Sequence, residues 1–300
     1  MKKSTNPPQQ TISLGNFNYG SLQSMMTFFS VPVADVKPLL KGTGLEPGIF
    51  DGKALVNLNF ERYAGFGGTY SSYVNEVEFN VVAFPSFRAG TEPSLSVAAY
   101  LNGEDQSKTY GNFRINVPCD SAVAVKAGSE NYGEIKFVAS FEFAVPDLNA
   151  PDIKTWWFRC YYPPIKPDQK PKPQSPYIFD LKVDTTGPTF PGQSTSPFSP
   201  VPAYANLKVT SGKDKGKKFM ITSSRVIFGL FNSWYDQTGS TPIKPLPNNA
   251  VELVIGKSNH KMQKEMAAVF KSNPPAVGVL LYNSPAAASS GHTRLADPVK

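Results

Sequence analysis

Alternating hydrophobic and polar residues recur along this chain and predict a protein built mainly from β-strands. The clearest case is residues 73–84, where Glu76, Glu78 and Asn80 occupy alternate positions between apolar residues. A period of two is typical of a strand with one face in the core and the other facing water or a pocket. Similar patterns predict strands at residues 25–32, 53–62, 94–102, 138–145, 155–162, 177–183, 204–210, 218–223, 225–231 and 251–255.

Helical patterns are rare by comparison. Residues 34–41 predict a short helix, and residues 257–271 predict an amphipathic helix because Met262 and Met266 share a face with Val269. The fold class that follows is mainly β, with a few flanking helices.

One domain over residues 17–282 accounts for the whole pattern. The polar, proline-bearing residues 1–16 predict a flexible arm, and the small, polar residues 283–300 predict a flexible tail. Two proline-rich loops, 163–176 and 188–202, are longer than ordinary connections. Long loops often cover a site in a compact domain, so both are candidate lids or subunit contacts.

Composition narrows the choice of partners. The net charge of +7 is spread along the chain, and its densest basic run, residues 213–218, lies in a predicted hairpin turn. No motif of a nucleic-acid-binding fold accompanies that run, so we expect no nucleic-acid partner. The sequence shows neither an apolar leader nor a segment long enough to span a membrane, which predicts a soluble, cytoplasmic protein without a membrane partner.

Metal and disulfide chemistry are not expected. The two cysteines, Cys119 and Cys160, cannot define a disulfide framework in 300 residues. The two histidines, His260 and His292, lie far from both in sequence, so no metal-ligand spacing is present. We therefore expect no metal and no cofactor.

A single lysine, Lys136, interrupts an apolar run at residues 135–139. In a strand it would point to the face opposite Ile135 and Phe137. If that face is buried, desolvation should lower the lysine's pKa and leave a usable amine nucleophile. If that face is exposed, Lys136 is an ordinary solvated residue.

The residues around Lys136 resemble the active-site segment of the acetoacetate decarboxylase superfamily, which carries a Schiff-base lysine. The matching residues are Gly128, Glu130, Tyr132, Gly133 and Lys136. Upstream, the segment from Tyr73 to Glu76 resembles the strand that supplies a carboxylate to the same pocket. Weaker similarity in the opening strand and helix extends the match over residues 20–160, approximately, in the family's order.

The resemblance implies both a fold and an activity. The fold would be an antiparallel, closed or nearly closed β barrel that encloses one small ligand. The activity would be that of a Schiff-base-forming lyase, either a decarboxylase or an aldolase-dehydratase, acting on a small keto acid or β-dicarbonyl compound. Lys136 would attack the carbonyl carbon and Glu76 would handle protons. Relatives that form homo-oligomers suggest the same for this chain.

A set of substrate-binding residues goes with this activity. Glu130 would orient the lysine or bind the iminium charge, Tyr73 and Tyr132 would donate hydrogen bonds, and Phe137 would contact the substrate. Arg114 and Arg159 are candidate carboxylate clamps. Phe137 stands where the decarboxylases have a second lysine, and residues 24–33 contain no arginine. We therefore expect a substrate other than acetoacetate, with an apolar part.

Two other interpretations remain open. The chain could be a ligand-binding or structural protein that keeps the barrel but has lost the chemistry, with Lys136 and Glu76 forming a buried ion pair. It could also be an all-β interaction protein whose match is accidental. Which glutamate faces the lysine, Glu76, Glu78 or Glu130, depends on strand register.

Overall fold

The computed structural model describes residues 18–66, 73–146, 152–166, 168–186, 194–196, 201–210, 214–227, 231–247, 249–284, 288–290 and 294–298. The arm predicted over residues 1–16 lies outside these ranges, as do parts of the predicted loops and tail. Strands β17 and β18 fall within the segment for which the sequence predicts a tail.

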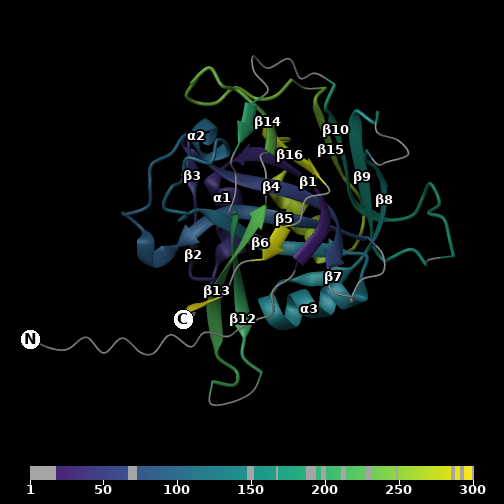
Figure 1. The fold of residues 1–300 in the computed structure, drawn as a ribbon, viewed down its shortest axis with the longest axis horizontal. Coiled ribbons are helices and arrows are strands. Elements are labelled where there is room, and N and C mark those ends of the chain that lie inside the picture. The colour runs from purple at the N-terminus through teal and green to yellow at the C-terminus, as the bar shows by residue number, and fades with distance from the viewer. Residues whose placement is uncertain are drawn as a thin grey trace, which may run out of the picture.

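Strands dominate the described part of the chain (Figure 1). They are β1 (Asn18–Val31), β2 (Leu45–Pro47), β3 (Ile49–Phe50), β4 (Lys53–Phe66), β5 (Val74–Pro85), β6 (Gly111–Cys119), β7 (Lys136–Val138), β8 (Ser140–Ala144), β9 (Thr155–Tyr161), β10 (Tyr177–Asp184), β11 (Ser194–Ser196), β12 (Val201–Lys208), β13 (Lys218–Ile227), β14 (Phe231–Tyr235), β15 (Val251–Ile255), β16 (Ala276–Ser284), β17 (Ala288–Ser290) and β18 (Arg294–Pro298). The α-helices are α1 (Val33–Val36), α2 (Val97–Leu101), α3 (Ala122–Tyr132) and α4 (Lys261–Val269), and short 3-10 helices follow α1 and β5.

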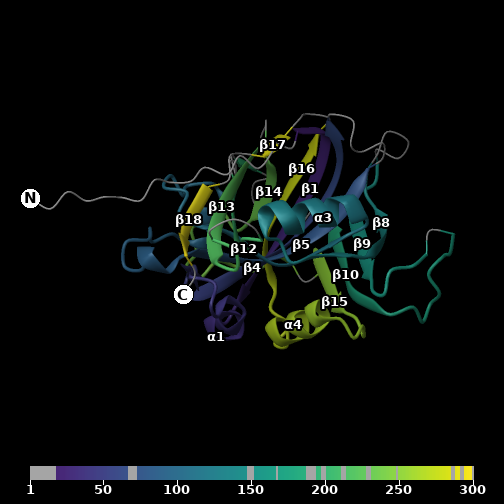
Figure 2. The same cartoon turned by 90° about the horizontal axis from the view of Figure 1, so that it is seen from below.

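The strands form two sheets. The main sheet has 14 strands and contains the run β12–β6–β5–β4, with β1 also paired to β4. The small sheet has four strands in the order β15–β10–β9–β8. Figure 2 shows α4 lying against β10 and β15 on the small-sheet side, while α3 lies near β7 and β12.

The predicted antiparallel arrangement is wrong for the main sheet, which is mixed. Strand β6 runs parallel to both β12 and β7. The parallel pair β6–β7 arises because α3 connects the two strands as a crossover, which returns the chain in the same direction. Among the described strands, the pairings run from β1 through β17, β13, β12, β6, β5 and β4 and return to β1. A period of two predicts that a segment is a strand, but it does not predict which strand it pairs with.

Individual elements agree with the sequence in most places. The amphipathic helix predicted over 257–271 is confirmed as α4, and its Met262 and Met266 are buried. The strand predicted over 94–102 is wrong, because residues 97–101 form α2. The hydroxyl of Ser96 caps this helix by accepting a hydrogen bond from the backbone N–H of Ala99.

Aromatic packing joins the two sheets. Phe60 of the main sheet stacks on Phe158 of the small sheet, with ring centroids 4.7 Å apart, and both side chains are fully buried. Strand β5 is buried along its whole length, so both of its faces lie inside the protein. Its polar residues are therefore interior residues and need partners there.

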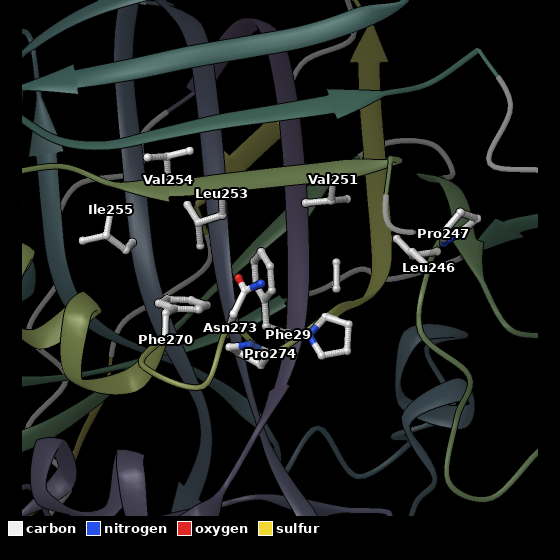
Figure 3. Close-up of a pocket in the computed structure, with 12 residues that line it drawn as sticks. Phe29, Leu246, Pro247, Val251, Leu253, Val254, Ile255, Phe270, Asn273 and Pro274 are labelled. Atoms are coloured by element: carbon white, nitrogen blue, oxygen red, sulfur yellow. The ribbon is translucent and has the colours of Figure 1, made fainter.

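A pocket lined mostly by apolar residues opens between the end of α4, β15 and β1 (Figure 3). Its volume is about 590 Å³, and Phe29, Leu253 and Phe270 are among the residues that line it. None of the site residues predicted from the sequence contributes to its wall. No helix in the described ranges combines the length and apolar character needed to cross a bilayer.

We expect the replacement Phe158→Ala to destabilise the protein by about 3–5 kcal/mol, because it empties the ring's place between the two sheets. Denaturant unfolding followed by circular dichroism measures the change in free energy. Phe87→Ala is the matched control, since that ring is 62% exposed and its loss should change stability by no more than about 0.5 kcal/mol. Equal effects for the two variants would contradict this account of the core.

Candidate functional site

The helix α3 precedes β7 and positions Lys136 at the start of that strand. The side chain of Ser121 caps α3 at its first turn, accepting a hydrogen bond from Ala124 N–H. The helix ends at Gly133, which adopts a left-handed conformation with φ of 64°. A Cβ at Gly133 would lie 2.7 Å from the carbonyl oxygen of Asn206, so this turn requires glycine for both reasons.

A second glycine, Gly128, brings α3 close to the lysine. A Cβ on Gly128 would lie 2.7 Å from Cδ of Lys136 and would also collide with the carboxylate of Glu134. The two glycines matched in the sequence motif therefore have physical roles. One ends the helix, and the other lets the helix lie directly against the lysine.

Lys136 is held by carboxylates in the protein interior. Its Nζ lies 2.6 Å from Oε2 of Glu76 and 3.5 Å from Oε2 of Glu134, and its side chain is 5% exposed. The hydroxyl of Tyr63 donates a 2.9 Å hydrogen bond to the same Oε2 of Glu76. Glu76 thus accepts from Lys136 on β7 and from Tyr63 on β4, and it joins three strands of the main sheet.

The pKa values follow from this arrangement. Burial lowers the pKa of Lys136, but Glu76 and Glu134 outweigh it, so the pKa stands well above its usual value. The predicted fall in this pKa is wrong, because desolvation was weighed without the two carboxylates. Burial raises the pKa of Glu76, while the ammonium of Lys136 opposes that effect. Burial and the nearby Glu76 raise the pKa of Tyr63, which keeps its hydroxyl protonated.

Arg114 forms the other side of the network. Its Nε lies 2.6 Å from Oε1 of Glu78, and its Nη1 forms an ion pair with Glu134. Glu134 therefore bridges Arg114 and Lys136. The sequence motif contains Glu134 between Gly133 and Lys136, but sequence reasoning assigned it no role. Arg114, predicted as a clamp for a substrate carboxylate, is engaged with carboxylates of the protein.

Polar side chains extend the network along two neighbouring strands. Nδ2 of Asn59 donates to Glu61 at 2.6 Å and to Glu78 at 3.1 Å. Nδ2 of Asn80 donates to Glu78 at 3.2 Å. The alternation that predicts β5 as a strand therefore marks a buried polar face, matched by alternate residues of β4.

Three carboxylates of this face form a compact group. Oxygens of Glu61, Glu76 and Glu78 lie within 4.8 Å of one another, and all three side chains are buried. Carboxylate groups are ligands that Mg²⁺, Ca²⁺ and Mn²⁺ accept. Here Lys136 and Arg114 already supply positive charge to Glu76 and Glu78, so the group holds together without an added cation.

The remaining predicted residues occupy other places. Tyr132 is buried at the end of α3, and Glu130 is exposed on the same helix. Phe137 points to the opposite side of β7 from Lys136 and stacks on His260 at 4.0 Å between centroids. These three roles stay predictions.

Two predicted residues lie apart from the lysine. Tyr73 is half exposed and contacts the guanidinium of Arg62, 4.4 Å from the ring centroid. Arg159 forms an ion pair with Asp180 on the small sheet. The structure therefore brings Lys136, Glu76 and Arg114 into one network, and it places Tyr73 and Arg159 beside other partners.

Tyr63 and Glu61 were missed by sequence reasoning. Asn59, Glu61 and Tyr63 are alternate residues of β4, so their side chains lie on the same face of the strand. Extending the alternation of polar and apolar residues along this strand would have included Glu61 and Tyr63. Their cross-strand partners are Val74 and Glu76 on β5.

Comparison by sequence finds no relative: no protein-family model matches this chain, and no curated protein matches it. Comparison by structure does. An acetoacetate decarboxylase from Legionella pneumophila is similar with a TM-score of 0.59 at 10% identity, covering 99% of this chain and 94% of that one.

Two further structures are similar at the same level. The enduracididine biosynthesis enzyme MppR, complexed with the condensation product of pyruvate and imidazole 4-carboxaldehyde, gives a TM-score of 0.57 at 11% identity, over 100% of this chain and 99% of that one. An acetoacetate decarboxylase-like enzyme from Sphingomonas wittichii RW1 gives 0.56 at 11% identity, again over 100% and 99%. The predicted resemblance is confirmed for the fold, which is that of the acetoacetate decarboxylase-like enzymes.

We expect the single variants Lys136→Met and Glu76→Gln each to cost about 3–5 kcal/mol of stability, because each removes one partner of a buried ion pair. The double variant should cost less than the sum of the two, since neither charge is then left uncompensated by the other. Denaturant unfolding of all four proteins completes the cycle.

Lys271→Met is the matched control. Lys271 also contacts a carboxylate, Asp35 at 2.7 Å, but its side chain is 64% exposed. Its loss should cost no more than about 1 kcal/mol. Strictly additive effects at Lys136 and Glu76 would show that the two groups do not interact.

Proposed function

We propose that this protein is a carbon–carbon lyase that acts on a small keto acid or β-dicarbonyl compound through a Schiff base at Lys136. The observation that carries the proposal is the contact of 2.6 Å between Nζ of Lys136 and Glu76 on a buried polar face. The fold shared with acetoacetate decarboxylase and MppR supports it.

The contact between Lys136 and Glu76 allows the lysine to be deprotonated and so to become a nucleophile. An ammonium cannot attack a carbonyl, so Nζ must first lose a proton, and Oε2 of Glu76 is the acceptor within reach. Proton transfer converts a buried ion pair into a neutral amine and a neutral carboxylic acid, which suits an apolar substrate that displaces solvent. The raised pKa of Glu76 is in the direction that this transfer needs.

The amine nitrogen then attacks the carbonyl carbon to form a carbinolamine. Glu76 returns its proton to the carbinolamine hydroxyl, which leaves as water and gives an iminium ion. The iminium accepts the electron pair of the breaking carbon–carbon bond, so that carbon dioxide or a carbonyl fragment leaves. The resulting enamine carbon is protonated through Glu76, which takes up this second proton from solvent, and water then hydrolyses the iminium, releases the product and restores the ammonium of Lys136. Glu134 and Tyr63 would keep Lys136 and Glu76 in place during these steps.

The substrate class rests on two observations. A similar fold, that of MppR, has been solved in complex with pyruvate, a small keto acid. In this chain Phe137 replaces the second lysine of the resemblance, and Arg114 is engaged by Glu78 and Glu134. We therefore favour a carbonyl compound with an apolar part over acetoacetate. No cofactor is required, and a cytoplasmic homo-oligomer remains part of the proposal.

The second candidate is a ligand-binding protein without chemistry. Its support is the raised pKa of Lys136, which favours a permanent ammonium paired with Glu76 and Glu134. In that case Lys136 and its partners serve to order the interior, and the ligand meets no nucleophile.

Borohydride trapping separates the two candidates. We expect sodium borohydride to reduce an imine between Lys136 and a small keto acid from a panel of pyruvate, acetoacetate and longer 2-keto acids. Intact mass and peptide mapping locate the adduct. Lys136→Arg should abolish trapping while it keeps a cation beside Glu76, and Lys126→Arg, on the exposed face of α3, should leave trapping unchanged. A folded protein that forms no adduct at Lys136 would favour the binding candidate.

The pH dependence of trapping tests the role of Glu76. Glu76 raises the pKa of Lys136, so Glu76→Gln should lower that pKa and move the midpoint of the trapping rate to lower pH. The maximal rate should also fall, because the proton acceptor is gone. Glu104→Gln, at an exposed position outside the network around Lys136, is the control and should change neither quantity. An unchanged midpoint in Glu76→Gln would show that Glu76 does not set the ionisation of Lys136.

A further inference from the structure

Two arginines of this protein lie against pairs of aromatic rings, and they differ in one respect. Arg159 has its guanidinium carbon 4.9 Å from the ring centroid of Tyr177 and 5.6 Å from that of Trp157. Its Nε donates a 2.7 Å hydrogen bond to Oδ2 of Asp180, which neutralises the charge. Two aromatic rings and one carboxylate therefore surround the guanidinium of Arg159.

Arg62 has the rings without the carboxylate. Its guanidinium carbon lies 4.4 Å from the ring centroid of Tyr73 and 5.4 Å from that of Phe143. No carboxylate among the described residues lies within ion-pair distance of Arg62. Its Nε is buried and has no hydrogen-bond acceptor, and its Nη1 makes a single, long contact of 3.5 Å to Gln23.

Arg62 therefore lacks, among the described residues, the carboxylate counter-ion that Arg159 has. Arg62 is half-buried, and desolvating a guanidinium without a counter-ion is costly; the two rings compensate for only part of that cost. The rings contact the guanidinium through cation–π interactions, so the only hydrogen bond at its edge to a described residue is the long contact from Nη1 to Gln23. Tyr73 is 50% exposed, so the site is open to solvent.

The site is separate from the lysine. Successive side chains of a strand point to opposite faces, so Arg62 points away from the face that holds Glu61. Across the strand pair, Glu61 lies opposite Glu76, whereas Arg62 lies opposite Asn75. Oδ1 of Asn75 is also buried without a hydrogen-bond partner. Two buried polar atoms without hydrogen-bond partners, Nε of Arg62 and Oδ1 of Asn75, therefore belong to residues paired across β4 and β5.

We propose that Arg62, with Tyr73 and Phe143, binds the carboxylate of a small ligand that carries an apolar or aromatic tail. The ligand's carboxylate takes the role that Asp180 has at Arg159. A planar guanidinium edge matches a carboxylate in a two-point contact, which makes arginine the residue for this recognition. The exposed ring of Tyr73 offers a surface for the tail. This site does not depend on the proposed Schiff-base activity.

The test uses carboxylates that lack a keto group, so that they cannot form an imine with Lys136. Protein labelled with ¹⁵N-arginine is titrated with acetate and with phenylacetate, and sodium chloride at equal ionic strength is the reference. We expect the Nε–H resonance of Arg62, assigned by its absence in Arg62→Met, to shift saturably with both acids. Phenylacetate should bind more tightly than acetate because its ring can pack on Tyr73.

Calorimetric titration with phenylacetate then compares variants. Arg62→Met and Arg62→Lys should each weaken binding about tenfold or more, since both lose the two-point contact. Arg159→Met removes the arginine that already has a carboxylate and should leave the affinity unchanged. Lys136→Arg should also leave it unchanged, because the lysine lies on the other face.

Two results would overturn the proposal. The first is a shift that does not saturate or that chloride reproduces. The second is equal affinity in wild type and Arg62→Met.

Discussion

The buried ion pair between Lys136 and Glu76 is the interaction on which the polar interior of this protein depends. Two charges inside a sheet are stable only when each has partners, and here the partners form a connected set. Glu134 joins the pair to Arg114, and Tyr63 donates a second hydrogen bond to Oε2 of Glu76. Removal of any one member leaves a charged group inside the protein, so the set constrains the strands that carry it.

The fold brings this set together through two features that are local in sequence. The bend at Gly133 ends α3 and starts the strand of Lys136, and the bare backbone of Gly128 lets the helix approach the lysine side chain. The third feature is long-range: β7 pairs in parallel with β6, which places Lys136 next to Val117. That pairing in turn sets Lys136 close to Glu76, 60 residues earlier in the chain.

The sequence predicted part of this arrangement. The alternation of polar and apolar residues gave the strand of Glu76, and the resemblance around Lys136 linked the two residues before the structure placed them together. The parallel pairing of β6 escaped prediction, because periodicity contains no information about partners. The pKa of Lys136 was predicted in the wrong direction for a related reason. Its sign depends on how many carboxylates surround the ammonium, and Glu134 was not recognised as one of them.

Lys136 and Arg62 lie on opposite faces of the main sheet, and they differ in the carboxylate partners that surround them. On one face, a lysine has more than one carboxylate partner, so its proton can move to Glu76 without leaving a lone charge. On the other face, an arginine has aromatic contacts but no carboxylate partner in the described part of the chain, and a guanidinium does not release its proton at any ordinary pH. The proposed proton transfer rests on the first arrangement. The proposed binding of an anion rests on the second, because a guanidinium cannot be neutralised by proton loss.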